Sequence, residues 1–377
     1  MLADSAAATS TRAIVLCADM RYFPLAFLAC RRLVQLRNRP SDFDVFLLTE
    51  RGEHLNDLPP SLGFIIFCPD FVHFLPEVAN RIAKKRGPFS FLRFFVPDLL
   101  PQCSQIIYLD CDIRIERPPD ALFDLNLGGA TIAAADDPSV YLPSALERDV
   151  RAYDQRLAGL GLSRDDGYFG SGVLLIDAES WRRRDIRASA MDLIARTEVD
   201  DQDALNIIFR RSWLPLSPRW NFESKLFGLD VESVLKPVIY HFAREKPWRP
   251  GEGSRAHRRW LKESLRAEPA LAFRFERSFE RYKRLIERRC KEFGQLLTFF
   301  LPSSHARLED RSVSRMRTLV RDYVLRGLDA EKFGDVTQNI GGITAGTLKA
   351  AVLGIRDARS SEGGSRNNLG GGWGAVR

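Results

Sequence analysis

Residues 106–112 read Ile-Ile-Tyr-Leu-Asp-Cys-Asp, a short apolar run that ends in two carboxylates. The continuous apolar run predicts a strand buried on both faces, as in a parallel sheet. The i, i+2 spacing puts Asp110 and Asp112 on one side of an extended chain. At a strand's carboxyl end they would face the crevice where α/β proteins bind ligands, and a divalent cation would offset their repulsion. Such a pair also arises by chance, so a metal site and a solvated loop are both open at this point.

Outward from this segment, strands and helices are expected to alternate. Short apolar runs predict strands at 13–18, 43–49, 64–68, 106–109, 131–135, 173–176 and 238–240. Helical spacing of apolar residues predicts helices at 23–36, 89–99 and 178–196. This alternation predicts an α/β fold, with a mixed sheet that is flanked by helices and joined by crossover connections.

Charge is spread unevenly along the 377 residues. The chain has 56 Lys and Arg against 49 Asp and Glu, a net charge of +7. Residues 1–243 carry −5, residues 244–332 carry +10 and residues 333–377 carry +2. Because the first two-thirds are acidic, we expect no basic nucleic-acid cleft in the main domain and no nucleic-acid partner. At 45% hydrophobic residues the chain can bury a full core, which excludes a disordered chain and a disulfide-stapled small fold.

Cysteine use favours a reducing compartment. The six cysteines form no C-x-x-C pair, which argues against a zinc or thioredoxin-type site. The beginning of the chain lacks the basic and apolar regions of a signal peptide, and no apolar run approaches the ~18–20 residues of a membrane span. We therefore expect a cytoplasmic location.

Three further segments carry groups that suit a ligand site. Residues 169–177 place Gly172 just before a buried strand, where glycine lets the backbone approach a ligand closely. Residues 201–206 (Asp-Gln-Asp-Ala-Leu-Asn) open a helix with acids, as helix N-termini prefer. His241 follows an expected strand and would complete an Asp-Asp-His metal site, and Lys246 would meet a phosphate. The alternatives are an ordinary charged helix start and a structural histidine.

Two enzyme classes place a D-x-D pair after an apolar strand. In haloacid-dehalogenase-like phosphatases the first Asp is a nucleophile, and Thr or Val usually follows two residues on. The residues here are Ile113 and Arg114, which disfavours that class. In nucleotide-sugar glycosyltransferases the pair holds a metal ion on a diphosphate. A non-catalytic protein that binds a nucleotide sugar is a third alternative.

Taken in order, these segments resemble glycosyltransferase family 8, whose members are retaining galactosyl- and glucosyltransferases. The resemblance covers residues 12–250 and rests on the order and spacing of several motifs. These are residues 19–22, 91–97 around Arg93, 109–112, 169–177 with Trp181-Arg182, 201–206, 219–221 (Arg-Trp-Asn) and the 241–248 ending with its Lys-Pro-Trp.

The resemblance implies a GT-A type fold, an Mn²⁺ (or Mg²⁺) cofactor and a UDP-sugar donor. Three residues match the family's metal ligands: Asp110, Asp112 and His241. The positions expected to hold the donor are Asp19 and Tyr22 at the uracil, Arg93, Gly172, and Lys246 at the diphosphate.

The resemblance also implies two catalytic residues. Asp201 would bind sugar hydroxyls, and Gln202 would lie beside the anomeric carbon, on the face opposite the leaving group. The acceptor would be a glycan or glycolipid, as in bacterial lipopolysaccharide or surface polysaccharide synthesis.

Three positions depart from the family pattern. Gly170 stands where the family usually has an Asn that contacts the donor, and Arg21 stands where an Asn is usual. The ending lacks the usual glycine after His241 and is short, with Arg244 and Glu245 before the lysine. Because these positions contact ribose, sugar and phosphate, they bear on the identity of the donor.

We expect three parts: a catalytic domain at 1–250, a basic helical appendage at 251–332 and a flexible Gly-rich tail at 333–377. The appendage combines arginines with an apolar block at 296–301, which favours peripheral contact with an anionic membrane, at its inner face. Solvated amphipathic helices that pack on the main domain are the alternative.

Overall fold

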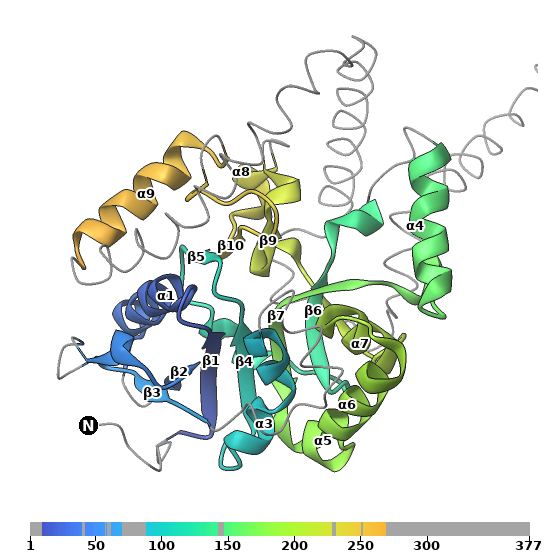
Figure 1. Cartoon of the computed structure of the whole chain (residues 1–377), viewed down its shortest axis with the longest axis horizontal. Coiled ribbons are helices and arrows are strands. Elements are labelled where there is room, and N and C mark those ends of the chain that lie inside the picture. The colour runs from blue at the N-terminus through green and yellow to red at the C-terminus, as the bar shows by residue number, and fades with distance from the viewer. Residues whose placement is uncertain are drawn as a thin grey trace, which may run out of the picture.

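The structure is a computed structural model that describes residues 10–39, 42–56, 58, 62–69, 88–141, 147–227, 231–249 and 252–268. The described part is an α/β fold with a large mixed sheet at its centre (Figure 1). The expected region 269–332 and the tail at 333–377 lie outside the described residues.

Seven strands form the large sheet in the order β3-β2-β1-β4-β7-β6-β8. All neighbouring pairs are parallel except the two pairs that β7 makes with β4 and β6. The strands are β1 (Arg12–Ala18), β2 (Asp44–Thr49), β3 (Ile65–Phe67), β4 (Gln105–Leu109), β6 (Ile132–Asp136), β7 (Phe169–Asp177) and β8 (Leu214–Leu216). The predicted mixed sheet is therefore confirmed.

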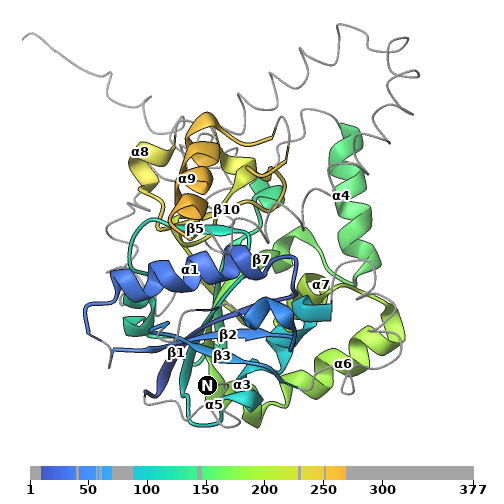
Figure 2. The ribbon, with the colours of Figure 1, turned by 60° about the vertical axis from the view of Figure 1, so that its left-hand side comes forward.

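A smaller sheet lies beside the carboxyl end of β4. It consists of β5 (Ile113–Ile115), β10 (Ile239–His241) and β9 (Phe222–Glu223), with β10 in the middle. Figures 1 and 2 show the small sheet above the main sheet, next to α8 (Glu232–Leu235) and α9 (Arg255–Arg266). Residues 110–112 cross from the large sheet to the small one, so any group on them lies between the two sheets.

The helices fall on both faces of the large sheet and around the small one. The α-helices are α1 (Phe23–Leu36), α3 (Val96–Leu99), α4 (Glu147–Gly159), α5 (Ala178–Arg183), α6 (Ile186–Thr197), α7 (Asp201–Ile208), α8 (Glu232–Leu235) and α9 (Arg255–Arg266). Short 3₁₀ turns occupy Glu53–Leu55, Pro88–Phe94, Asp120–Asp124, Pro138–Tyr141, Arg164–Asp166, Pro218–Trp220 and Ser224–Leu226.

Two apolar clusters cover the two faces of the sheet, which explains the continuous apolar runs. In β1 the side chains at 13, 15 and 17 join one cluster, and those at 14, 16 and 18 join the other. Trp181 of α5 and Phe209 pack in the first cluster, and Phe23 and Phe27 of α1 pack in the second. Each such large side chain contributes about 1.5–3 kcal/mol when it is fully buried. Both layers of helices are therefore packed firmly against the sheet.

Three local predictions are wrong. The expected helix at 89–99 is a 3₁₀ turn followed by α3, because Pro97 suits the first turn of a helix and cannot continue one. The expected helix at 178–196 is two helices, since Asp185 between them has φ +48°, a left-handed conformation. Gly172 lies inside β7 and not before the strand, because its carbonyl accepts the Asp110 amide and extends the ladder.

α9 begins the predicted basic region and packs on the main domain. Its Leu261 contacts Leu25 of α1, with Trp260 and Trp248 beside them. The Ser254 side chain accepts a hydrogen bond from the His257 amide and caps the helix. The domain division at residue 250 stays a prediction. No helix in the part of the chain that the structure describes is both long and apolar enough to cross a bilayer.

Candidate functional site

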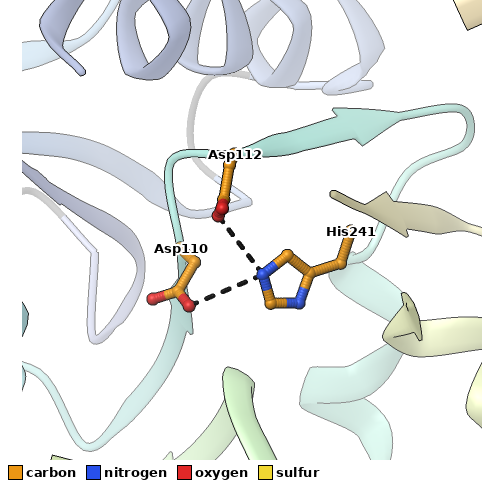
Figure 3. Close-up of side chains that lie close together, drawn as sticks. All are labelled: Asp110, Asp112 and His241. Carbon is orange, nitrogen blue, oxygen red and sulfur yellow. Dashed lines mark ion pairs between the residues drawn. The ribbon is translucent and has the colours of Figure 1, made fainter. Parts of the chain in front are cut away.

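Two carboxylates and an imidazole converge between the two sheets (Figure 3). Asp110 directly follows β4, Asp112 directly precedes β5, and His241 ends β10. His241 Nε2 lies 3.2 Å from an oxygen of Asp112 and 3.7 Å from an oxygen of Asp110. One ligand atom from each of the three lies within 4.8 Å of the others. Carboxylate and imidazole ligands bind divalent cations at about 2.0–2.6 Å, so this spacing fits one shared ion.

The orientation of His241 is fixed by its second ring nitrogen. Nδ1 lies 2.8 Å from Oδ1 of Asn221, which follows the 3₁₀ turn before β9. When Nδ1 donates a hydrogen bond to this amide oxygen, Nε2, which faces the carboxylates, keeps its lone pair for a metal ion. This is the tautomer that a metal ligand needs.

Gly172 on β7 lets the three groups come this close. A Cβ there would lie 2.7 Å from His241 Nδ1 and 3.0 Å from an Asp110 oxygen, and closest of all to His241 Cε1. Real Cβ atoms do not approach other atoms so closely, and here the neighbours are held in place. The glycine is therefore required by close approach within the site.

Lys246 provides a positive charge at the same carboxylates. Its ammonium group pairs with Asp112, and it is 6% exposed. Burial would raise the pKa of Asp112, but Lys246 and His241 outweigh it and hold that pKa well below its ordinary value. Asp112 is consequently ionised across the physiological range and ready to bind a cation.

Arg93 links the metal-site carboxylate to the start of α7. Its guanidinium lies 3.0 Å from Asp110 and 2.9 Å from Asp201, and it donates to Ser171 at 2.6 and 2.9 Å. Burial alone would lower the pKa of Arg93, but Asp201, Tyr108 and Asp110 outweigh burial and raise that pKa above its ordinary value. The guanidinium therefore stays charged. Arg93 thus fixes two expected site residues relative to each other.

Asp201 and Gln202 form the first turn of α7. The side chain of Asp200 caps this helix by accepting the Asp203 amide, so both residues are held at the sheet edge. Gln202 accepts the Ser171 amide at 3.0 Å and donates to Asp137 at 3.2 Å. Its side-chain amide is therefore held by contacts on both sides.

Asp19 and Tyr22 lie after β1, on the far side of the carboxylates from α7. Asp19 accepts the backbone amides of Arg21 and Tyr22 at 3.0 and 2.9 Å, and its carboxylate also pairs with the Arg21 guanidinium. The Tyr22 ring meets Trp248 edge-on, with ring centroids 6.4 Å apart. These residues form a separate polar and aromatic station at the same edge of the sheet.

The structure thus brings Asp110, Asp112, His241, Gly172 and Lys246 into one cluster. Three other expected residues adjoin it through hydrogen bonds or ion pairs: Arg93, Asp201 and Gln202. Asp19 and Tyr22 follow the neighbouring strand β1, where burial and then the charge of Asp112 raise the pKa of the Tyr22 hydroxyl. Their individual roles toward a donor stay predictions.

Several residues beside the site were not predicted from the sequence. Asn221 belongs to a motif that supported the resemblance, but it received no role. Asp137 follows an expected strand, as Asp110 does, and that position was a usable signal; here it pairs with Lys225 at 2.7 Å. Glu223 lies on the two-residue strand β9, where no pattern could single it out.

Comparisons with known proteins bear on the family to which the chain belongs. The profile of glycosyl transferase family 8 matches residues 13–251. General stress protein A of Bacillus subtilis is 31% identical over 180 residues, which are 42% of this chain and 58% of that protein. Glycosyltransferase GlyF of Streptococcus pneumoniae is 28% identical over 268 residues, 66% of this chain and 60% of that protein. The chain thus matches less than two-thirds of the length of either relative.

A solved structure shares the fold. The galactosyltransferase LgtC, in complex with donor and acceptor sugar analogs, superposes with a TM-score of 0.51 at 19% identity, over 67% of this chain and 95% of that one. This likeness confirms the expected GT-A type fold. The profile match covers most of the described residues, and the chain therefore belongs to glycosyl transferase family 8.

Proposed function

We propose that this protein transfers a hexose, galactose or glucose, from a UDP-sugar to a glycan or glycolipid acceptor, with retention of configuration and dependence on a divalent cation. The observation that carries the proposal is the convergence of Asp110, Asp112 and His241 at the carboxyl edge of the sheet, in a chain of family 8. Open α/β sheets bind ligands at this edge.

The order of the strands suggests how the donor lies. Asp19 and Tyr22 follow β1 and would hold the uracil, with the Tyr22 and Trp248 rings as an apolar wall. Asp110 follows β4, the next strand in the sheet, and would lie at the diphosphate. The sugar would then lie over β7, towards the first turn of α7 and Gln202.

Charge stabilisation explains how the leaving group departs. When bound at Asp110, Asp112 and His241, Mn²⁺ or Mg²⁺ would act as a Lewis acid on the negative charge that develops on UDP. Lys246, already beside Asp112, adds a second positive charge without a proton transfer. Arg93 keeps Asp110 and Asp201 in a fixed relation, so the diphosphate and the sugar hydroxyls are positioned together.

Gln202 suits a retaining reaction that uses no enzyme carboxylate as nucleophile. A neutral amide, held by Ser171 and Asp137, can stabilise the positive charge at the anomeric carbon by its dipole. As the bond from the anomeric carbon to the phosphate breaks, the acceptor hydroxyl oxygen bonds to that carbon on the same face, and an oxygen of the leaving phosphate takes the hydroxyl proton.

The acceptor and location follow from the relatives and from α9. We assign the protein to lipopolysaccharide or surface polysaccharide synthesis, as the resemblance to family 8 implies. The exposed face of α9 carries Arg255, Arg258, Arg259, Lys262 and Arg266. These residues would let a cytoplasmic enzyme contact the anionic inner face of the membrane.

The test is UDP release from UDP-galactose and UDP-glucose by the purified protein, with Mn²⁺ and with EDTA. We expect turnover of at least one donor with Mn²⁺ and none with EDTA. Equal turnover in EDTA would contradict the metal dependence. Tight UDP binding without any turnover would favour a non-catalytic sugar-nucleotide-binding protein. Hydrolysis of simple phosphate esters with Mg²⁺ would instead support the phosphatase alternative.

A further inference from the structure

A buried carboxyl group beside Gly170 is not used by the mechanism above. Glu223 is 3% exposed, and its carboxylate makes no hydrogen bond or ion pair with any residue that the structure describes. A Cβ at Gly170 would lie 2.6 Å from Oε1 of Glu223 and 3.0 Å from Nδ2 of Asn221. The glycine therefore leaves the space that this carboxyl group occupies.

An unpaired donor lies over the same glycine. Nδ2 of Asn221 is buried and has no partner within the described part of the chain, although Oδ1 of the same amide holds His241. Buried polar groups in native proteins almost always have a hydrogen-bond partner. An acceptor and a donor left open together, next to a cluster of metal-binding type, point to a polar ligand that supplies both partners.

Position along the sheet identifies which part of a donor this ligand would be. Gly170 and Gly172 face the same side of β7, because side chains alternate along a strand, and they lie about 7 Å apart. Gly172 faces His241 and Asp110. Gly170 is one station further along, and Asp137, which follows β6, comes next in the sheet order.

The stations therefore run from Asp19 after β1, through Asp110 after β4, to Gly170 on β7. A base at the first and a diphosphate at the second leave the third for the sugar. This assignment rests on the proposed function, because it takes the donor to be a nucleotide sugar.

We propose that Glu223, in the space left by Gly170, is a specificity-determining residue that selects a neutral hexose over a hexuronate. Its carboxylate accepts a hydrogen bond from a sugar hydroxyl, and the Asn221 amide donates one to a sugar oxygen. The carboxylate of a hexuronate would face the like charge of Glu223, and Lys225, the lysine that acts on Glu223, is already paired with Asp137.

The test compares two donors that differ in this charge, UDP-galactose and UDP-galacturonate, together with their gluco counterparts, at about pH 8, where a carboxylate is ionised. The parent should prefer the neutral donor by about 100-fold in kcat/KM, and Glu223→Gln should reduce that preference by about 10-fold. Glu179→Gln, an exposed carboxylate on α5, is the matched control and should leave the preference unchanged. A preference that is the same in Glu223→Gln and the parent overturns the proposal, as does a parent that uses both donors equally.

A second set of variants covers a loss of folding. Gly170→Ala alone should displace Glu223, lower the melting temperature and weaken the preference. The double variant Gly170→Ala/Glu223→Ala should recover the melting temperature, because the added methyl group then meets no carboxyl group. If the losses of melting temperature in Gly170→Ala and in Glu223→Ala simply add in the double variant, the two residues do not compete for one space, and the proposal is contradicted.

UDP binding separates this inference from the proposed function. Affinity for UDP with Mn²⁺ should be equal, within about twofold, in the parent and in Glu223→Gln, because Glu223 is assigned to the sugar station. If the parent binds UDP but turns over no donor, the Kd values of the two nucleotide sugars give the same preference. If the parent binds no UDP, the proposed function fails, and the assignment of Glu223 fails with it.

Discussion

Two carboxyl groups at the same sheet edge, Asp112, which is partly buried, and Glu223, which is buried, have opposite electrostatic environments. Asp112, between the sheets, is paired with Lys246 and faces His241, and its pKa is far below the ordinary value. Glu223, over β7, has no pairing partner within the described residues, and burial, with Asp137, raises its pKa to about 7. Both side chains are desolvated, so the difference comes from the positive groups around them.

The comparison shows how one edge can serve two purposes. Around Asp112 the chain supplies positive charge and keeps the carboxylate ionised for a cation. Around Glu223 the positive groups are Lys225, which is paired with Asp137, and His241, and neither forms an ion pair with the Glu223 carboxyl group, which stays available to a neutral ligand. In the proposed function, this difference in charge pairing separates the station of a metal-bound diphosphate from the station of the sugar.

The largest effect is expected when the charge at the diphosphate station is removed. Asp112→Asn keeps the volume but removes a ligand charge and leaves the buried Lys246 without its partner. We expect turnover with Mn²⁺ to fall by about 10³-fold, as when a key electrostatic group is lost from an active site. Steady-state UDP release measures this. Asp192→Asn, on the exposed face of α6, is the control, and full activity in Asp112→Asn would rule out the metal assignment.

Loss of the positive charge of Lys246 should have a smaller effect. Lys246→Met retains the buried alkyl stem and removes the ammonium group beside Asp112. We expect kcat to fall by about 10²-fold, with Mn²⁺ still bound, because a single charge on the leaving group is lost. Lys262→Met, on the exposed face of α9, should change nothing. A variant that loses Mn²⁺ affinity but keeps kcat at saturating metal would show that Lys246 acts on the ligands instead.

Crowding of the site at Gly172 should have a smaller effect still, on the affinity for the metal ion. Gly172→Ala puts a methyl group against His241 and Asp110, so we expect Mn²⁺ affinity, measured by titration calorimetry with UDP, to drop by about 10-fold. Gly159→Ala is the matched control, because a Cβ there has open space. If both alanine variants bind Mn²⁺ like the parent, the close approach at Gly172 has no bearing on the site.

The smallest expected effect is on stability, at Glu223 of the sugar station. The pKa of Glu223 in the folded protein, about 7, is above its ordinary value of 4.5, so folding takes up a proton between these values. Its contribution therefore favours the folded state most below about pH 4.5 and is lost as the pH rises through 7. Glu223→Gln should remove this dependence and melt a few degrees above the parent at alkaline pH. If the melting temperatures of the parent and of Glu223→Gln change with pH in the same way between pH 5 and 8, this prediction is contradicted.

Much of the sheet was predictable because burial on two faces leaves a continuous apolar signal. The runs at 13–18 and 106–109 coincide with β1 and β4 within a residue. The pair Asp110 and Asp112 was predictable for a related reason, since a strand end fixes where the following side chains go. The helix breaks at Pro97 and Asp185 depend on local backbone geometry, which apolar spacing does not report.

The sugar station was not predictable from the sequence. Glu223 and Gly170 are 53 positions apart in the sequence, and β9 is too short to show any period. Their contact arises only because β9 pairs with β10, whose last residue, His241, faces β7. The departure at Gly170 was visible, but the group that fills its space depends on tertiary structure.

The most direct test of the central claim is calorimetric titration of UDP into the intact protein, with Mn²⁺ and with EDTA, for the parent and for His241→Ala. The account predicts that Mn²⁺ tightens UDP binding by at least about 10-fold in the parent and has little effect in the variant. UDP binding that is equally tight in EDTA, or an equal Mn²⁺ effect in His241→Ala, would contradict a cation held by Asp110, Asp112 and His241.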